Sequence, residues 1–129
     1  PMQMLPAPAQ GALAVECRAD DEATLALVRL LDDPAARAEA AAERAVLAQL
    51  EAGCSAPVGA LAQLALGDPD DHGDPVRELY LRACVIAVDG SDAVRASSTG
   101  DPSRAEEIGR RLAQELLADG ADTMMGSRT

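Results

Sequence analysis

The sequence lacks lysine, asparagine, tryptophan and phenylalanine, and Tyr80 is its only aromatic residue. Its 11 basic residues are therefore all arginines, and 22 acidic residues give a formal net charge of -11. Without lysine the chain can form neither a lysine Schiff base nor a Walker A phosphate site. An acidic surface repels phosphate backbones, and a single aromatic residue offers no platform on which bases could stack. We therefore expect no nucleic-acid partner.

Cysteine is also scarce, since Cys17, Cys54 and Cys84 lie 37 and 30 residues apart. An odd number of cysteines without a C-x-x-C pair supports neither a zinc site nor a disulfide framework, and reduced thiols are typical of the cytoplasm. No apolar run approaches the roughly 20 residues of a membrane span, and residues 1–8 lack the basic and apolar regions of a signal peptide. The sequence predicts a cytoplasmic protein with no membrane partner.

The N-terminal quarter has the pattern of a strand followed by a helix. Residues 11–18 form a nearly continuous apolar run, which is typical of a strand buried on both faces, and Asp20 and Asp21 can cap a helix over about 22–31. Such a strand needs neighbours, so we expect residues 1–32 to be the C-terminal remnant of an upstream α/β domain. An unpaired apolar strand favours association, so we expect disorder there or pairing with a second copy of the chain.

A helix over about 34–52 follows, because Asp33 and Pro34 form a cap with proline at the first helical position and Gly53 is a natural terminator. The period then changes to two, which predicts strands over about 58–66, 78–88 and 93–99. Loop signals fill 67–75, and a tight turn is expected at Asp89 and Gly90.

A last helix is expected over about 102–118, ended by Gly120, with apolar residues on one face. The sequence thus predicts an α+β fold: a three-stranded antiparallel sheet packed against helices, preceded by a strand and helix left over from an upstream α/β domain. We therefore expect two parts: residues 1–32, the remnant of the upstream domain, and residues 33–129, the C-terminal domain.

The acidic segment 67–75 matches the template of a calcium-binding loop only in part. Asp68 fits its first position, but His72 stands at the fifth and Leu79 at the twelfth, where a bidentate glutamate is needed. A solvated turn is the better interpretation. The sequence also has no G-x-S-x-G motif with a nucleophilic serine for His72, its only histidine, so a Ser-His-Asp triad is excluded.

Two longer motifs are more specific: LPAPAQGALAVECR at residues 5–18 and AERAVLAQLEAGCSAPVGA at residues 42–60. Together with YLRACV at 80–85 and LAQELLADGA at 112–121, they resemble the porphobilinogen deaminase family, also called hydroxymethylbilane synthase. The resemblance covers nearly all of the chain, which matches the C-terminal two-fifths or so of a family enzyme. One departure is Ala52, where the family usually has the first glycine of Gly-Gly-Cys.

The resemblance implies a role in tetrapyrrole and haem biosynthesis. Family enzymes polymerise four porphobilinogen units into hydroxymethylbilane on a dipyrromethane cofactor, which is held by a cysteine thioether. Cys54 matches that cysteine. Gln10 and Gly11 match residues at the mouth of the family's catalytic cleft. Arg18 belongs to the same motif and pairs either with a propionate or acetate of the pyrrole chain or with a structural carboxylate.

The resemblance also implies what this stretch does not contain. The family's catalytic aspartate and most of its substrate-binding basic residues lie upstream, so no catalytic residue and no metal site is assigned here. We expect the chain alone to be inactive and the full-length enzyme to be a monomer that binds porphobilinogen and the growing polypyrrole. Cys17 and Cys84 are expected to be small buried residues. The alternative function is a non-catalytic acidic α+β module that binds a protein partner through the exposed face of its sheet.

Overall fold

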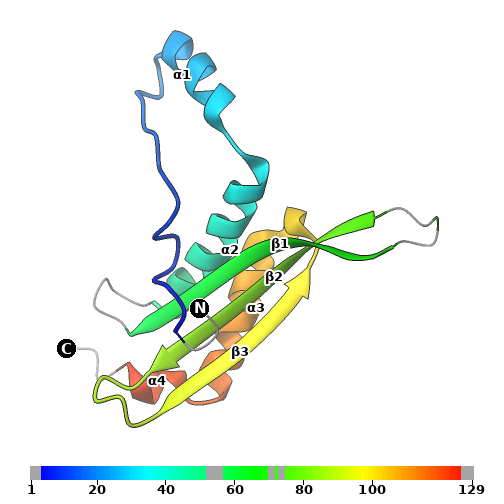
Figure 1. The fold of residues 1–129 in the computed structure, drawn as a ribbon. Helices are drawn as coiled ribbons and strands as arrows, with labels where there is room; N and C mark the ends of the chain where they lie inside the picture. The colour runs from blue at the N-terminus through cyan, green and yellow to red at the C-terminus, as the bar shows by residue number, and fades with distance from the viewer. Residues whose placement is uncertain (1–3, 52–56, 70–71, 73–74, 126–129) are drawn as a thin grey trace.

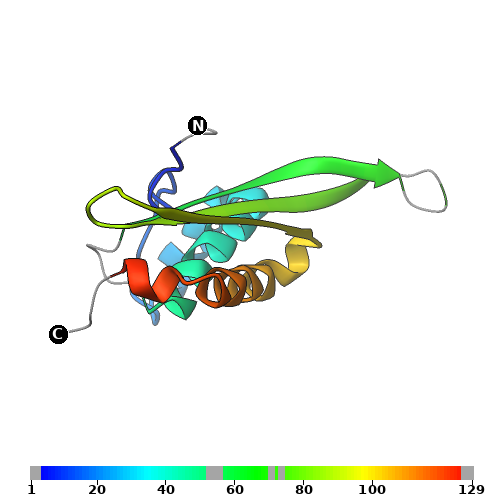
Figure 2. The same ribbon diagram turned by 90° about the horizontal axis from the view of Figure 1, so that it is seen from below.

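The computed structural model describes residues 4–51, 57–69, 72 and 75–125. Its centre is a three-stranded antiparallel sheet with the order β1-β2-β3. Three helices, α2, α3 and α4, lie on one face of this sheet, and the other face is not covered by a helix (Figures 1 and 2). The predicted α+β fold with helices on one side of an antiparallel sheet is confirmed.

The sheet consists of β1 (Val58–Pro69), β2 (Pro75–Ile86) and β3 (Ala93–Gly100). The register pairs Ala60 with Ala83 and Ala83 with Ala96. β1 continues beyond the predicted end at residue 66, and β2 begins before the predicted residue 78 but ends before the predicted residue 88. After an irregularity in the register, Pro69 pairs with Pro75, at the two ends of a segment that was expected to be a loop. The two strands form a ribbon that projects beyond the helix layer (Figure 2). Strand structure therefore extends into both described ends of this acidic segment.

The turn between β2 and β3 follows the sequence prediction. Gly90 has a φ of 74°, and its backbone N–H donates to the carbonyl of Ala87 at 2.8 Å. Asp89 accepts hydrogen bonds from the backbone and hydroxyl of Ser91 at 3.0 and 2.6 Å. A left-handed backbone suits glycine because it has no Cβ. The short connection places β3 beside β2 in the antiparallel sense.

Helix α2 (Pro34–Gln49) begins as predicted at Asp33, whose carboxylate accepts from the N–H groups of Ala35 and Ala36. It ends earlier than the predicted Ala52. Leu50 is its C-terminal cap, and Glu51 has a φ of 50°. A residue in the left-handed region terminates the helix here, although glycine would adopt this conformation at less cost. Gly53, the predicted terminator, lies outside the described residues.

The last helical region begins with the 3₁₀ turn η2 (Pro102–Arg104), capped by Asp101, and continues as α3 (Ala105–Ala118). Gly120, with a φ of 95°, separates α3 from the short α4 (Ala121–Met124). The predicted apolar face of α3 is confirmed, since Ala105, Ile108, Leu112 and Leu116 are all buried.

The core lies between the sheet and helices α2 and α3. Its largest fully buried side chains come from α2, β2 and α3. They are Val46, Leu50, Leu79, Leu81, Val85, Leu112 and Leu116. Many of the remaining buried residues are alanines, so the helices can approach the sheet and one another closely. This domain is stabilised mainly by a compact aliphatic core.

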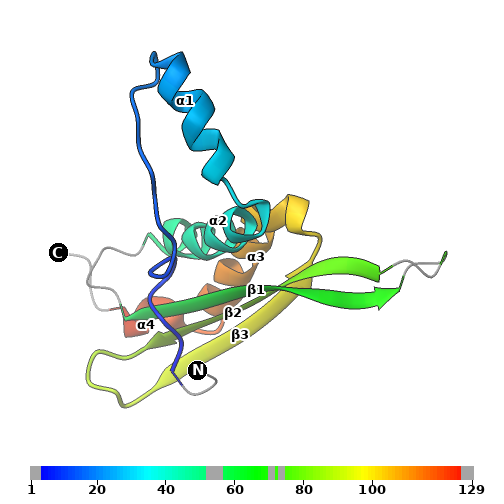
Figure 3. The same ribbon diagram turned by 45° about the horizontal axis from the view of Figure 1, so that its top comes forward.

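Before α2 the chain forms an arm that projects away from the sheet (Figures 1 and 3). Its helix α1 (Glu22–Val28) and 3₁₀ turn η1 (Arg29–Leu31) agree with the helix predicted over about 22–31. The strand predicted over 11–18 is wrong for this structure, because that segment pairs with no strand and is largely exposed. Leu13, for example, is 97% exposed. A strand needs a neighbouring strand to bond with, and pairing with a second copy stays a prediction.

In the described part of the chain, no helix is both long enough and apolar enough to cross a membrane.

Candidate functional site

The segment before the arm crosses the outer edge of β1. Pro6 accepts a hydrogen bond from the N–H of Ala60 at 3.0 Å. Leu5 lies against Gly59 so closely that a Cβ at residue 59 would be 2.9 Å from the Leu5 Cβ. The absence of a side chain at Gly59 thus makes room for this segment on the sheet.

Glu43 of α2 joins the same segment to the edge of the sheet. One carboxylate oxygen accepts from the N–H of Ala62 in β1 at 2.7 Å, and the other accepts from the N–H of Ala9 at 2.5 Å. The residue is only 7% exposed. A buried carboxylate needs such hydrogen-bond donors, because burying an unpaired charge is very costly.

Glu39, one turn earlier on α2, accepts from the N–H of Leu64 at 2.8 Å. Pro6, Glu43 and Glu39 therefore satisfy alternate N–H groups along the outer edge of β1. Edge strands otherwise offer such groups to another chain. Neither glutamate was predicted from the sequence, although their spacing with the buried Val46 and Leu50 places them on the helix face that meets the sheet.

Gln10 and Gly11 lie directly after the residue that Glu43 holds. The N–H of Gln10 donates to the carbonyl of Ala7, and the N–H of Ala12 donates to the carbonyl of Ala9, both at 3.2 Å. Ala9 has a φ of 56°. These bonds form a tight turn, and a Cβ placed on Gly11 would meet nothing within 4 Å. The turn therefore presents its backbone to open space.

This turn forms one wall of a groove of about 480 Å³. Gln10 and Gly11 face α2 and β1 across it, and its other lining residues include Glu39, Glu43 and Leu61. Of the four candidate site residues, the structure thus brings Gln10 and Gly11 together. Arg18 is exposed and lies outside this groove.

The cysteines differ in their surroundings. Cys54 falls in 52–56, outside the described residues. Cys84 on β2 is 3% exposed, as predicted, whereas Cys17 is only half-buried and lies outside any strand. The prediction for Cys17 is wrong here because the strand that would bury it does not form. Both Cys17 and Cys84 are free thiols.

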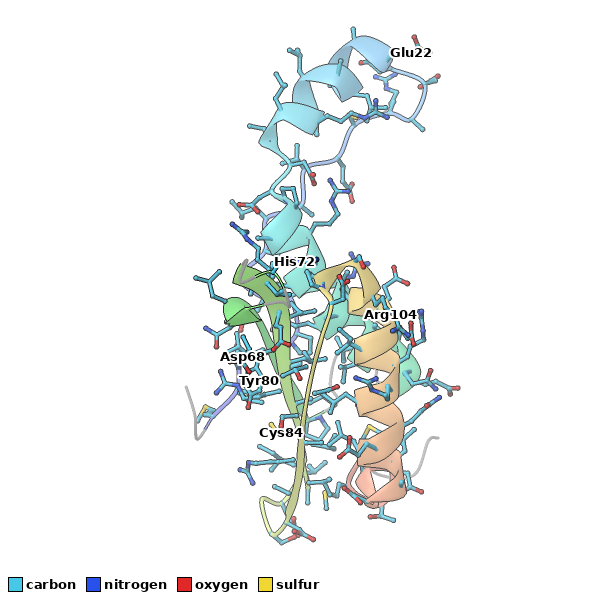
Figure 4. The ribbon with its side chains drawn as sticks, turned by 90° about the vertical axis from the view of Figure 1, so that its right-hand side faces the viewer. Glu22, Asp68, His72, Tyr80, Cys84 and Arg104 are labelled. Carbon is cyan, nitrogen blue, oxygen red and sulfur yellow. The ribbon has the colours of Figure 1, made fainter. Side chains whose placement is uncertain are left out.

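Asp68 and His72 of the acidic hairpin both lie within the described part of the chain. Asp68 ends up in the projecting ribbon and His72 is exposed near its tip (Figure 4). Within the described residues, no group of three histidine, cysteine, aspartate or glutamate side chains could hold a metal ion. Asp68 and His72 are both exposed, as expected of residues in a solvated segment.

The uncovered face of the sheet carries the only aromatic residue. Tyr80 points away from α3 (Figure 4). The guanidinium carbon of Arg82 lies 5.4 Å from the Tyr80 ring centre, and Arg82 donates to the Gln63 side chain at 2.7 Å. This small polar cluster belongs to the face on which the alternative function, a protein-interaction module, would depend.

The groove offers only a partial fit to a pyrrole that carries carboxylate side chains. The open backbone at Gly11 suits the approach of a flat ring, and Gln10 offers an uncharged polar group. Its charged lining residues, however, are the glutamates Glu39 and Glu43. The described residues of the groove therefore fit the ring of such a group but supply no cation for its carboxylates.

Comparison with known proteins gives the same family as the sequence motifs. The family model described as "Porphobilinogen deaminase, C-terminal domain" matches residues 37–118. The chain belongs to the porphobilinogen deaminase family. It is 60% identical over 125 residues to the porphobilinogen deaminase of Nocardia farcinica, covering 97% of this chain and 36% of the relative. The match to that of Mycobacterium avium is 57% over 129 residues, covering 99% of this chain and 41% of the relative.

A third relative, the porphobilinogen deaminase of Mycobacterium tuberculosis, is 56% identical over 125 residues, which are 97% of this chain and 40% of the relative. The chain therefore spans 36 to 41% of the length of these three relatives. Residues 37–118 contain the cysteine motif around Cys54 and the whole sheet. The region matched by the family model thus contains both the sheet and the segment that carries Cys54.

Proposed function

We propose that this chain is the cofactor-carrying C-terminal portion of a porphobilinogen deaminase. The full-length protein would polymerise four porphobilinogen units into hydroxymethylbilane, as a deaminating transferase of tetrapyrrole and haem biosynthesis in the cytoplasm. The observation that carries the proposal is the family match over residues 37–118, within which Cys54 stands in the cysteine motif. Residues 1–32 would belong to the upstream domain and 33–129 to the cofactor-carrying domain.

Cys54 is proposed to hold dipyrromethane through a thioether. When attached, this group is the primer to which porphobilinogen units add with loss of ammonia. Cys54 follows the last residue of α2, Gln49, by five positions. An ordinary thiol is sufficient if its pyrrole partner is strongly electrophilic, so the proposal requires no lowered thiol pKa.

Gln10 and Gly11 are proposed to line the mouth of the cleft, where the open backbone of the turn suits a flat pyrrole. Arg18 is proposed to pair with a pyrrole carboxylate or with a structural carboxylate. Because the groove beside Gln10 has acidic charges only, the cations for the substrate carboxylates would come from the upstream part of the enzyme. The chain alone is therefore expected to show no porphobilinogen turnover.

The proposal is tested by mass spectrometry of the full-length protein purified from cells. Trypsin cleavage after Arg44 and Arg77 releases the peptide 45–77, in which Cys54 is the only cysteine. We expect this peptide to carry a dipyrromethane-sized adduct and the Cys54→Ala protein to lack both adduct and turnover. Cys84→Ala serves as the matched control and should retain the adduct.

An unmodified Cys54 in an active or inactive full-length protein would contradict the proposal. It would favour the alternative, a non-catalytic module that uses the uncovered face around Tyr80. The inactivity of the chain alone is checked separately by assaying the purified 129-residue protein beside the full-length enzyme, and measurable product from the former would overturn that part.

A further inference from the structure

Residues 5–9 are attached to the C-terminal domain at three points. Leu5 packs on Gly59, the carbonyl of Pro6 accepts from Ala60, and the N–H of Ala9 donates to Glu43. All three partners belong to α2 or β1, within residues 33–129. This short segment, which the sequence places with the upstream domain, is bonded in the structure to the domain that follows.

Glu43 differs from its neighbour Glu39 in what it connects. Both carboxylates accept from an N–H group of β1, but the second oxygen of Glu43 also accepts from Ala9. The Glu43 side chain is therefore a bridge between the crossing segment and the sheet. Its removal would leave the N–H groups of Ala9 and Ala62 without their acceptor, whereas removal of Glu39 affects the N–H of Leu64.

The attachments end immediately after this bridge. Gln10, Gly11 and Ala12 form the turn, and beyond it the chain is exposed, as shown by Leu13. Figure 3 shows the arm leaving the sheet from this point. The change from a bonded segment to an exposed arm thus falls within the turn that carries two candidate site residues.

We propose that Glu43 is a positioning residue that fixes the turn of Gln10 and Gly11 to the C-terminal domain, with the chain free to hinge beyond Ala12. Gln10 and Gly11 then move with the domain that contains Cys54 rather than with the arm. This consequence for the cleft rests on the proposed function, because only there do Gln10 and Gly11 form its mouth. The attachment itself does not depend on that function.

The test is amide hydrogen exchange, followed by NMR in the 129-residue chain, for Glu43→Ala and its matched control Glu39→Ala. Alanine suits a helix interior, so both variants should keep α2 intact. In Glu43→Ala we expect the amide of Ala9, which loses its acceptor, to exchange about two- to tenfold faster, as the loss of one hydrogen bond implies. The amide of Ala60 should also exchange faster, because the segment that carries its acceptor Pro6 is released. In Glu39→Ala these two amides should be unchanged, and that of Leu64 should be faster.

The core amides of Leu81 and Leu112 separate a local effect from a global one. They should keep their rates in both variants, and an equal acceleration at Ala9 and Leu81 in Glu43→Ala would overturn the proposal. Unchanged exchange at Ala9 and Ala60, or no protection of Ala9 in the original chain, would overturn it as well. If Glu43→Ala does not fold, Glu43→Asp replaces it, because a side chain one methylene shorter cannot reach both N–H groups.

The two proposals can fail independently. The adduct on Cys54 is measured in the full-length enzyme and reports the proposed function. Exchange at Ala9 is measured in this chain and reports the bridge through Glu43. A missing adduct with faster exchange would refute only the function, and a present adduct with unchanged exchange would refute only the positioning role.

Discussion

Gly109 of α3 lies directly against the backbone of Ala42 in α2. A Cβ on Gly109 would be 2.3 Å from the carbonyl oxygen of Ala42 and 2.7 Å from the Cβ of Ala45. Real side chains do not approach so closely, so the two helices can pack at this distance only because residue 109 has no side chain. Small residues on both helices thus set the thickness of the layer that covers the sheet.

Gly109→Ala is therefore expected to destabilise the domain, although alanine is the better helix former. The helices would have to separate, and overpacking of this kind costs about 1–3 kcal/mol. The measurement is the free energy of unfolding in urea. Gly11→Ala is the matched control, since its Cβ would meet nothing within 4 Å, and it should change the free energy by less than about 0.5 kcal/mol. Equal stability of Gly109→Ala and the original chain would contradict the close packing.

Most of the domain could be predicted from sequence because its signals are local. Asp33 followed by Pro34 marks the start of α2, and Asp89 with Gly90 marks the turn between β2 and β3. The alternation of apolar residues predicts the strands, since one face of each must be buried. These features depend on residues close in the chain, and the structure has all of them.

The predictions are wrong or incomplete where the structure of a segment depends on partners far away in the sequence. Residues 11–18 have a strand pattern but bond with no strand here, so the pattern alone does not make one. The segment containing Asp68 has loop composition, yet β1 continues through an irregularity in the register to the pairing of Pro69 with Pro75. The spacing of Glu43 places it on the face of α2 that meets the sheet, but its partners could not be predicted, because Ala9 and Ala62 are backbone groups 34 and 19 residues away.

The core makes a second prediction through Leu81, which is fully buried at the centre of β2. Leu81→Ala should lower the free energy of unfolding by about 2–5 kcal/mol, because the substitution removes apolar contacts and leaves a cavity. Leu13→Ala is the matched control, since Leu13 is 97% exposed in the arm. Its effect on urea unfolding should be close to zero. A comparable loss in both variants would show that the arm is packed in solution.

A third prediction concerns the residue that caps the start of α2. The Asp33 carboxylate accepts from Ala35 at 2.8 Å and from Ala36 at 3.2 Å. Asp33→Ala should cost about 0.5–2 kcal/mol in the free energy of unfolding, as loss of an N-terminal cap does. The neighbouring Asp32→Ala removes only an exposed ion pair with Arg37, which is worth about 0–1 kcal/mol. Thermal or urea unfolding should therefore rank Asp33→Ala as the less stable variant, and the reverse order would contradict the cap.

Acid sensitivity is the fourth prediction, and it depends on three exposed carboxyls. Hydrogen bonds from Thr24, Ser91 and Ser103 hold the pKa values of Asp21, Asp89 and Asp101 below their usual value of 3.8. Asp21 lies at the start of α1, Asp89 in the turn between β2 and β3, and Asp101 just before η2 and α3.

A carboxyl whose pKa is lower in the folded state stabilises that state at pH values above its unfolded pKa. This contribution is lost as the pH falls from about 5 through the lowered folded values. The fall in net negative charge over the same range has the opposite effect, because it relieves repulsion in a chain of charge -11. The change in stability of the original chain with pH is therefore a balance of both.

The triple variant Asp21→Asn, Asp89→Asn, Asp101→Asn separates the two effects. The control replaces three other exposed aspartates, Asp20, Asp68 and Asp119, by asparagine, so that the net charge is the same. The urea midpoint is measured between pH 7 and pH 3. From pH 5 to pH 3 the first variant should lose less stability than the control, because the carboxylates that acid would protonate are already absent. Parallel pH profiles for the two variants would show that the three hydrogen-bonded carboxyls make no pH-dependent contribution.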